Sequence, residues 1–315
     1  MTVEHLFHAS QWAWQEIDID NGKQAEELAQ KHHTCKRWIK DVKESNTNSV
    51  GMYTGTPGEE VMWGSLVYIQ NPEEKDDQYV FHFHLTRTEM MTANLDLSRL
   101  DYANEKTMKE KMQHAETPIE GFLVLIGEIM THFLLEIDKF EEKLRDLLWE
   151  IKEHNNIKTL NRTANTEHQL LIWKNLIIPM NEIRMVVEEV FGDEIMDGPR
   201  FKQTKRRIDR ARSLIRDYEE EIEALISLED VVSSHRGNEI MKTLTVITTL
   251  FTPVTALGAI WGMNFKHMPE LEWKYGYLFA GLLIGASTFA LYAFLKKRGW
   301  IGDILEVHGK KSFFD

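Results

Sequence analysis

A single uncharged stretch decides the fold: Thr243-Leu-Thr-Val-Ile-Thr-Thr-Leu-Phe-Thr-Pro-Val-Thr-Ala-Leu-Gly-Ala-Ile-Trp261. Its length of about 19 residues is close to what a helix needs to cross the apolar core of a bilayer. A second uncharged run, from Tyr275 to Leu295, follows after a short polar turn. Two apolar runs this close together predict a membrane hairpin.

The first run is unusually rich in hydroxyl groups. Residues at steps of three and four share one face of a helix, and here that face is small and polar: Met241, Thr245, Thr248, Thr252, Thr255, Ala259 and Gly262. Bulkier apolar side chains occupy the other faces. Such a face suits close helix–helix packing, which periodicity alone favours. It would equally suit the wall of a water-filled pore.

Two short motifs follow this run. Gly262-Met263-Asn264, and then Met268-Pro269-Glu270-Leu271, resemble the signature of the CorA-type magnesium transport family. In that family the triplet ends the first of two membrane helices, and the second motif lies in the loop between them. Over the C-terminal quarter of the chain the resemblance rests on these specific motifs. Over the rest of the chain it concerns only the order of the structural elements.

The resemblance implies roles for individual residues. Gly262, Met263 and Asn264 would form a selectivity filter, with Asn264 facing a hydrated cation, and Met268, Pro269, Glu270 and Leu271 an outer loop. The family pattern also implies a pore-lining face: Asn238, Met241, Leu244, Thr248, Thr252, Thr255 and Ala259. A glycine cap followed by an asparagine turn would explain the triplet as well.

The resemblance further implies a homopentamer in which Mg²⁺ is the transported ion and also the regulatory one. In the family, cytosolic Mg²⁺ between subunits holds the channel shut. No organic cofactor is expected. The family often has an acid directly after the triplet and its phenylalanine, where this chain has Lys266 and His267. The choice among Mg²⁺, Co²⁺, Ni²⁺ and Zn²⁺ therefore stays open.

Charge and composition point in the same direction. The 315 residues carry a formal net charge of −13, which argues against nucleic acid and favours cations as partners. Cys35 is the sole cysteine, as expected in a reducing compartment. Arg236 and Lys242 precede the first run, and Lys296-Lys297-Arg298 closes the second. The positive-inside rule then places both termini in the cytoplasm and the short turn outside the cell (inner) membrane.

We expect an α+β protein in three parts: a cytosolic α/β domain at residues 1–118, long cytosolic helices at 119–238, and a membrane part at 239–315. In the first part, β-branched and aromatic content predicts strands at Trp12–Ile17, Val61–Ile69 and Tyr79–Leu85. A short acidic helix is expected at Gly22–His33. Several copies would assemble as a funnel, because two membrane helices cannot enclose a conduit alone.

The sequence pattern of the middle part, residues 119–238, predicts long helices. Apolar residues repeat every three or four positions from about Ile119, with a turn at Asn155-Asn156 and a bend at Pro179. Phe122–Leu135 is apolar enough to suggest a third span, but Glu128 and His132 interrupt it, so we expect a buried soluble helix. A stalk helix from about residue 199 keeps its apolar phase into the membrane run, which predicts one continuous helix.

The remaining chemistry-bearing residues give weak signals. His82 and His84 alternate with apolar residues, and without a third ligand at a recognisable spacing they predict a polar strand face rather than a metal site. Acidic runs on the helices suit a solvated surface, with cation sensing as the alternative. We find no catalytic motif, so an enzyme is not expected.

Three functions remain open from the sequence. The first is Mg²⁺ uptake through an oligomeric pore, driven by the membrane potential and gated by cytosolic Mg²⁺. The second is a zinc, cobalt or nickel transporter of the same superfamily. The third is a membrane-anchored coiled-coil sensor or scaffold without transport, which would not need Asn264 or the threonine face.

Overall fold

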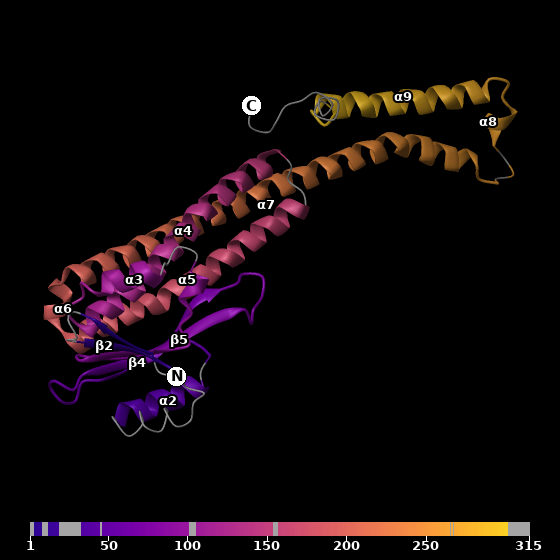
Figure 1. The fold of residues 1–315 in the computed structure, drawn as a ribbon. Coiled ribbons are helices and arrows are strands. Elements are labelled where there is room, and N and C mark those ends of the chain that lie inside the picture. Colours follow the sequence, from indigo (N-terminus) through magenta and orange to yellow (C-terminus); the bar gives the residue numbers. More distant parts are fainter. Residues whose placement is uncertain are drawn as a thin grey trace. The chain divides into compact units, whose positions relative to one another are not determined.

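The computed structural model describes residues 3–7, 12–18, 33–44, 46–100, 105–153, 157–264, 266 and 268–301. The chain divides into two compact units (Figure 1). The first comprises residues 1–147 and 161–224, and the second comprises residues 148–160 and 225–315. The fold is mixed α+β, with a sheet domain followed by long helices.

The first unit is built on a six-stranded sheet of order β1-β2-β6-β5-β4-β3. Its strands are β1 (Val3–Phe7), β2 (Trp12–Ile17), β3 (Ser49–Tyr53), β4 (Val61–Gln70), β5 (Gln78–Thr86) and β6 (Glu89–Ala93). β2 and β6 pair parallel, and every other neighbouring pair is antiparallel. The three expected strands are confirmed as β2, β4 and β5. The helix expected at Gly22–His33 falls almost wholly outside the described residues.

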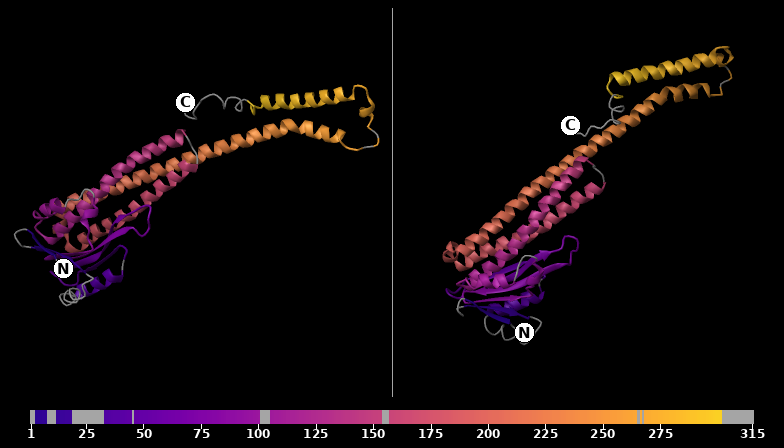
Figure 2. Two further views of the ribbon diagram at one scale, coloured as in Figure 1. Left: turned by 45° about the vertical axis from the view of Figure 1, so that its right-hand side comes forward. Right: turned by 45° about the horizontal axis from the view of Figure 1, so that its top comes forward.

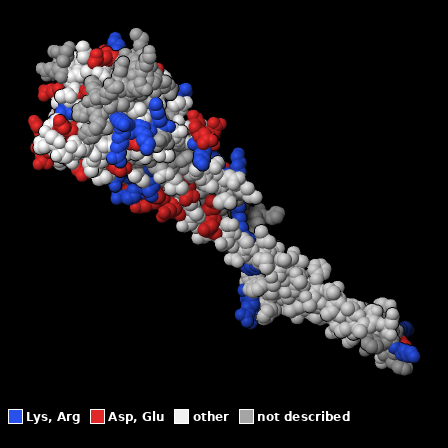
Figure 3. Space-filling model, turned by 90° about the horizontal axis from the view of Figure 1, so that it is seen from below, with Lys and Arg blue, Asp and Glu red and all other residues white. Residues whose placement is uncertain are grey.

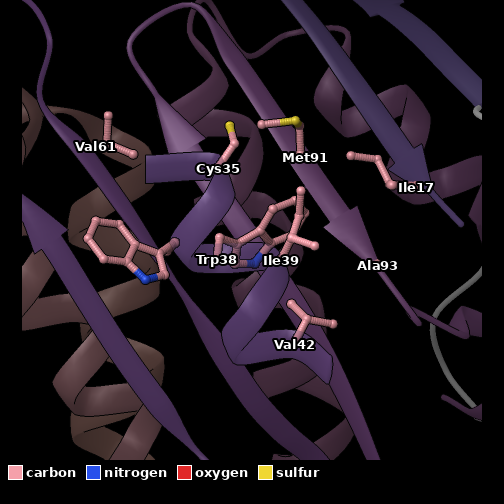
Figure 4. Close-up of a cluster of buried hydrophobic side chains, with 9 residues drawn as sticks. Ile17, Cys35, Trp38, Ile39, Val42, Val61, Met91 and Ala93 are labelled. Carbon is pink, nitrogen blue, oxygen red and sulfur yellow. The ribbon is translucent and has the colours of Figure 1, made fainter. Parts of the chain in front are cut away.

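Both faces of this sheet are covered. On one face, helix α2 (His33–Glu44) inserts Trp38 and Ile39 among strand residues such as Ile17 and Met91 (Figure 4). On the other face, Phe83 meets Phe122 of α4 (Pro118–Glu153), with ring centroids 5.0 Å apart. The sheet is therefore the middle layer of three.

The strand face that we expected to be polar at His82 and His84 is buried. Both imidazoles are buried, with 3% and 0% of their surface exposed. His82 Nδ1 lies 2.7 Å from the Ser65 hydroxyl, and His84 Nε2 lies 3.1 Å from the Thr34 hydroxyl. The reason is α2, whose Thr34 and Trp38 lie against His84 on this face of the sheet. Among the described residues, no three His, Cys, Asp or Glu side chains gather as a metal site.

Burial of His82 predicts a loss of stability in acid. Desolvation lowers the pKa of its imidazole from 6.5 to about 4. The unfolded chain therefore takes up a proton below pH 6.5 that the native protein refuses until about pH 4. The stabilisation is complete above pH 6.5 and is lost as the pH falls through this window, by about 3 kcal/mol.

Urea unfolding of the purified full chain, followed by tryptophan fluorescence from pH 7 to pH 4, measures this loss. His82→Gln is expected to flatten the pH dependence, because a neutral amide can still bond Ser65. His168→Gln, at an exposed histidine, should leave this pH dependence unchanged. An unchanged slope in His82→Gln would contradict the assignment.

The helices follow in chain order. After the short η1 (Leu97–Arg99) come α3 (Glu105–Met112), α4, α5 (Ile157–Phe191), α6 (Asp193–Asp197), α7 (Pro199–Trp261), α8 (Pro269–Glu272) and α9 (Gly276–Lys297). Pro179, at which we expected a bend, lies inside α5, and the helix continues on both sides of it. The turn expected at Asn155-Asn156 lies outside the described residues.

Two expectations about the long helices are confirmed. The apolar window of α4 is 78% buried inside the protein, as expected of a core helix. α7 is a single helix of 63 residues, so the stalk and the first apolar run are continuous. It begins with Pro199 in the first turn, where a missing backbone N–H costs no hydrogen bond. At about 1.5 Å per residue, this helix is roughly 95 Å long.

In the first unit α4, α5 and α7 form a three-helix bundle, seen side by side in both views of Figure 2. Phe140 of α4 lies 5.0 Å from Trp173 of α5 and 5.7 Å from Tyr218 of α7, measured between ring centroids. Near the other end of the bundle, Glu128 of α4 accepts hydrogen bonds of 2.9 Å from the Lys111 ammonium of α3. Thr204 of α7 donates to the Leu123 carbonyl at 3.0 Å.

Candidate functional site

The second unit presents two long apolar helices whose surfaces are exposed. The apolar windows of α7 and α9 are only 6% buried, and their mean hydropathies are 1.6 and 2.0. Figure 3 shows this region as a surface almost free of charge, with charged groups near its ends. Soluble proteins do not leave such surfaces to water, so these two helices are suited to a bilayer.

The membrane run of α7 has one face that packs on α9. Val246 is buried against Leu295 and Ile301, with Leu250 and Tyr292 alongside. The half-buried positions of this run continue the same line at steps of three and four residues: Leu250, Pro253, Leu257 and Trp261. The helix pair is therefore closed along this seam.

The face that the sequence assigns to a pore lies opposite. With 3.6 residues per turn, it is about half a turn away from the Val246–Leu250 seam. All seven residues are exposed in the single chain: Asn238, Met241, Leu244, Thr248, Thr252, Thr255 and Ala259. α9 does not cover this stripe, so within the chain the threonines do not serve the packing of the hairpin.

The threonine hydroxyls of this face share one geometry. Thr245, Thr248, Thr252 and Thr255 each donate to the backbone carbonyl four residues earlier, at 2.7, 2.7, 2.9 and 3.0 Å. Because each hydroxyl proton is engaged by the helix itself, the oxygen presents its lone pairs outward. Water bound to a cation points its hydrogens away from the ion, so a row of acceptor oxygens fits a hydrated cation.

The Gly262-Met263-Asn264 triplet follows directly after the last residue of α7. Gly262 N–H donates to the Gly258 carbonyl at 2.9 Å, and Met263 N–H donates to the Ile260 carbonyl at 3.3 Å. Asn264 is exposed and no longer helical. Its side-chain amide is thus held at the helix end on a short, partly hydrogen-bonded turn.

Gly262 does not form the left-handed cap that glycine often provides at a helix end. Gly299, which ends α9, has a φ of 76° and closes the helix through the Trp300 N–H to the Leu295 carbonyl at 3.0 Å. Gly262 does not adopt a positive φ. A Cβ there would lie 3.1 Å from the Gly258 carbonyl oxygen. Its missing side chain instead leaves the backbone at the helix end accessible.

The expected outer-loop residues are partly ordered into α8. Met268 precedes this short helix, Pro269 opens it, and Glu270 and Leu271 lie within it. Trp273 packs against Tyr275 and Phe279, with ring centroids 6.5 and 5.6 Å away. Aromatic residues favour the membrane–water boundary, so this cluster suits the end of a hairpin.

The sequence analysis missed the partner of the seam. It did not identify Tyr292, Leu295 and Ile301 as the residues that cover Val246. Val246, Leu250, Pro253 and Leu257, at steps of four, three and four residues, mark one side of α7 in the sequence, but not the residues of α9 that cover it. Thr245, which lies on the hydroxyl-rich face but outside the family pattern of pore residues, shares the exposure and geometry of the other threonines.

Comparisons with known proteins match this arrangement. A family model described as CorA-like Mg²⁺ transporter protein matches residues 9–297. Magnesium transport protein CorA of Bacillus subtilis (strain 168) is 43% identical over 303 residues, covering 96% of this chain and 95% of that protein. Cobalt/magnesium transport protein CorA of Thermotoga maritima is 26% identical over 182 residues, covering 56% and 51%.

A solved structure shares the fold. The complete structure of the CorA magnesium transporter from Methanocaldococcus jannaschii superposes with a TM-score of 0.70, covering 95% of this chain and 94% of that one. The sequence identity is 14%, so this likeness concerns the fold alone.

Proposed function

Because the chain belongs to the CorA-like Mg²⁺ transporter family, we propose that it takes up Mg²⁺ through a pore formed by several copies of α7. The family consists of membrane transporters of divalent cations, so this chain is a transporter and not an enzyme. The observation that carries the pore is the exposed row of threonine oxygens opposite the α9 seam, which ends at Asn264.

In this proposal the filter consists of Gly262, Met263 and Asn264. Mg²⁺ gives up its water reluctantly and usually keeps several ligand waters. A ring of neutral amide and backbone oxygens would hydrogen-bond to those waters without holding the ion as tightly as carboxylates would. Asn264 is exposed, and Gly262 has no side chain to shield its backbone, so both suit this role.

The proposed pore runs from the filter along the threonine face to Asn238. Rings of Met241 and Leu244, whose side chains are 61% and 57% exposed in the single chain, would form the apolar constriction that closes by dewetting. The membrane potential supplies about 2.3 kcal/mol per charge per 100 mV, hence roughly 4.6 kcal/mol for a divalent ion. Uptake therefore needs no nucleotide.

The topology proposed is two spans in the cell membrane with both termini in the cytoplasm. Residues 1–118 and 119–238 would lie in the cytosol, and residues 239–315 would form the membrane part and tail. Lys296, Lys297 and Arg298 at the end of α9 support this orientation under the positive-inside rule. A homopentamer is the proposed assembly, with cytosolic Mg²⁺ holding it closed.

Uptake into liposomes containing the purified protein tests the function. We expect Mg²⁺ entry that increases with an inside-negative potential and falls as internal Mg²⁺ is raised. Parallel measurements with Co²⁺, Ni²⁺ and Zn²⁺ decide the ion preference. Zn²⁺ entry without Mg²⁺ entry would favour the zinc alternative, and flux insensitive to internal Mg²⁺ would remove the proposed gating.

A further inference from the structure

The outer face of α5 in the first unit is unusually apolar. Leu171, Ile178 and Met185 are 45%, 54% and 46% exposed. They are spaced by seven residues, nearly two helical turns, so they form one line along the helix. Glu182 and Glu189 are exposed on the same face. Among the described residues no ion pair involves either carboxylate.

The outer face of α7 in the same unit has the opposite charge. Lys202, Arg206 and Arg210 are exposed at steps of four residues. They line a shallow, open depression on the surface of α7 together with Pro199, Gln203 and Arg207. Lys202 pairs with Asp197 at 3.1 Å, whereas no ion pair within the described part of the chain involves Arg206 or Arg210. Like charges one turn apart repel, so an acidic partner would stabilise this stripe of Lys202, Arg206 and Arg210.

These two faces lie at the same level of the bundle. Among the described residues, polar contacts between α5 and α7 of one chain join Lys174 to Glu219 at 2.6 Å, Asn181 to Arg212 at 3.5 Å, and Glu188 to Lys205 at 4.0 Å. Each step of seven residues along α5 is matched by seven residues back along α7. In this register Glu182 is level with residue 211 of α7, beside Arg210, and Glu189 is level with residue 204, beside Arg206.

We propose that this α7 stripe of one copy docks on the outer α5 face of the next copy in the ring. The inference rests on the proposed ring assembly and names its contact. A ring requires two unlike patches that point in different directions at the same height, as the outer faces of two helices in a three-helix bundle do (Figure 2). Met185 and Ile178 would pack on the aliphatic parts of the long side chains in the α7 stripe. Glu182 and Glu189 would then lie close to Arg210 and Arg206 of the neighbouring copy.

Disulfide crosslinking of the full chain tests the contact. Met185→Cys combined with Arg206→Cys places thiols at nearly the same level on the two faces. Mild oxidation is expected to give a ladder of crosslinked species that ends at the size of the ring. Each single variant should give none, because the contact joins unlike patches; the native Cys35 is buried. A ladder in a single variant, or none in the pair, would overturn the contact.

The electrostatic part has its own test within the same cysteine pair. Adding Arg210→Glu sets an acid against Glu182 of the neighbouring copy and is expected to slow crosslinking at least about tenfold at low salt. Adding Glu182→Arg as well should restore the rate, which loss of folding would not allow. A monomeric wild-type protein would contradict the ring and the proposed function. A ring without the ladder would contradict this contact alone.

Discussion

Replacing Asn264 by alanine is expected to abolish Mg²⁺ flux while leaving assembly intact. The side chain is exposed beyond the end of α7 and makes no hydrogen bond to the described parts of the chain, so its removal costs the fold little. The flux is lost because recognition of the ion fails: each copy no longer has the neutral amide oxygen that we propose binds the water shell of the ion. We expect flux at the background of empty liposomes.

Two controls give this result its meaning. The mass of the Asn264→Ala assembly in detergent should equal that of the wild type. Trp273→Phe, in the aromatic cluster of the same loop, should keep most of the flux. Normal flux in Asn264→Ala would show that the amide takes no part in selecting the ion.

The second large effect is expected on the threonine face. Thr248→Leu combined with Thr252→Leu replaces two outward oxygens by apolar side chains and would add two apolar rings to the pore. An apolar constriction gates by losing its water, so we expect flux to fall at least about a hundredfold. Because these positions lie opposite the α9 seam, the hairpin itself should stay folded.

Ser287→Ala is the matched control for this double variant. Ser287 lies on α9, and its hydroxyl also donates to the carbonyl four residues earlier, at 2.7 Å. The change removes a hydroxyl of the same geometry from the helix that does not line the proposed pore, and it should leave the flux within about twofold. Equal losses in both variants would mean that the effect is one of helix packing.

The elements that the sequence predicted well are those with a long, uninterrupted period. The apolar phase of the stalk continues into the membrane run, and α7 is indeed one helix. Glu128 and His132 led us to expect a helix buried inside the protein for the apolar part of α4, because charged groups are costly in lipid, and its apolar window is 78% buried. Here the local pattern and the tertiary environment agree.

The missed elements have physical reasons. β6 reads Glu-Met-Met-Thr-Ala, in which methionine and alanine favour helices over strands. β3 contains Gly51, which fits because the Trp63 ring lies where a side chain would be. The burial of His82 and His84 depends on α2, whose apolar residues Cys35, Trp38, Ile39 and Val42 recur at steps of three and four, a helical period that the sequence analysis did not use. Tertiary packing, not local preference, decides these cases.

The candidate site likewise has one part that the sequence predicted and one part that it did not. The exposed threonine face was predictable, since spacing alone places Thr248, Thr252 and Thr255 together. The seam between α7 and α9 was not, because the register between two uncharged helices is set by the fit of Val246 against Tyr292 and Leu295. Nothing polar along that seam marks the pairing in the sequence.

The most direct measurement is the water accessibility of single cysteines along α7 in the assembled protein. With Cys35→Ala as background, Thr248→Cys, Thr252→Cys and Thr255→Cys are expected to react with a small water-soluble thiol reagent and to lose flux on reaction. Leu250→Cys and Leu257→Cys, on the seam side, should stay unreactive. Unreactive threonine positions in a fully assembled protein would contradict a water-filled pore lined by this face.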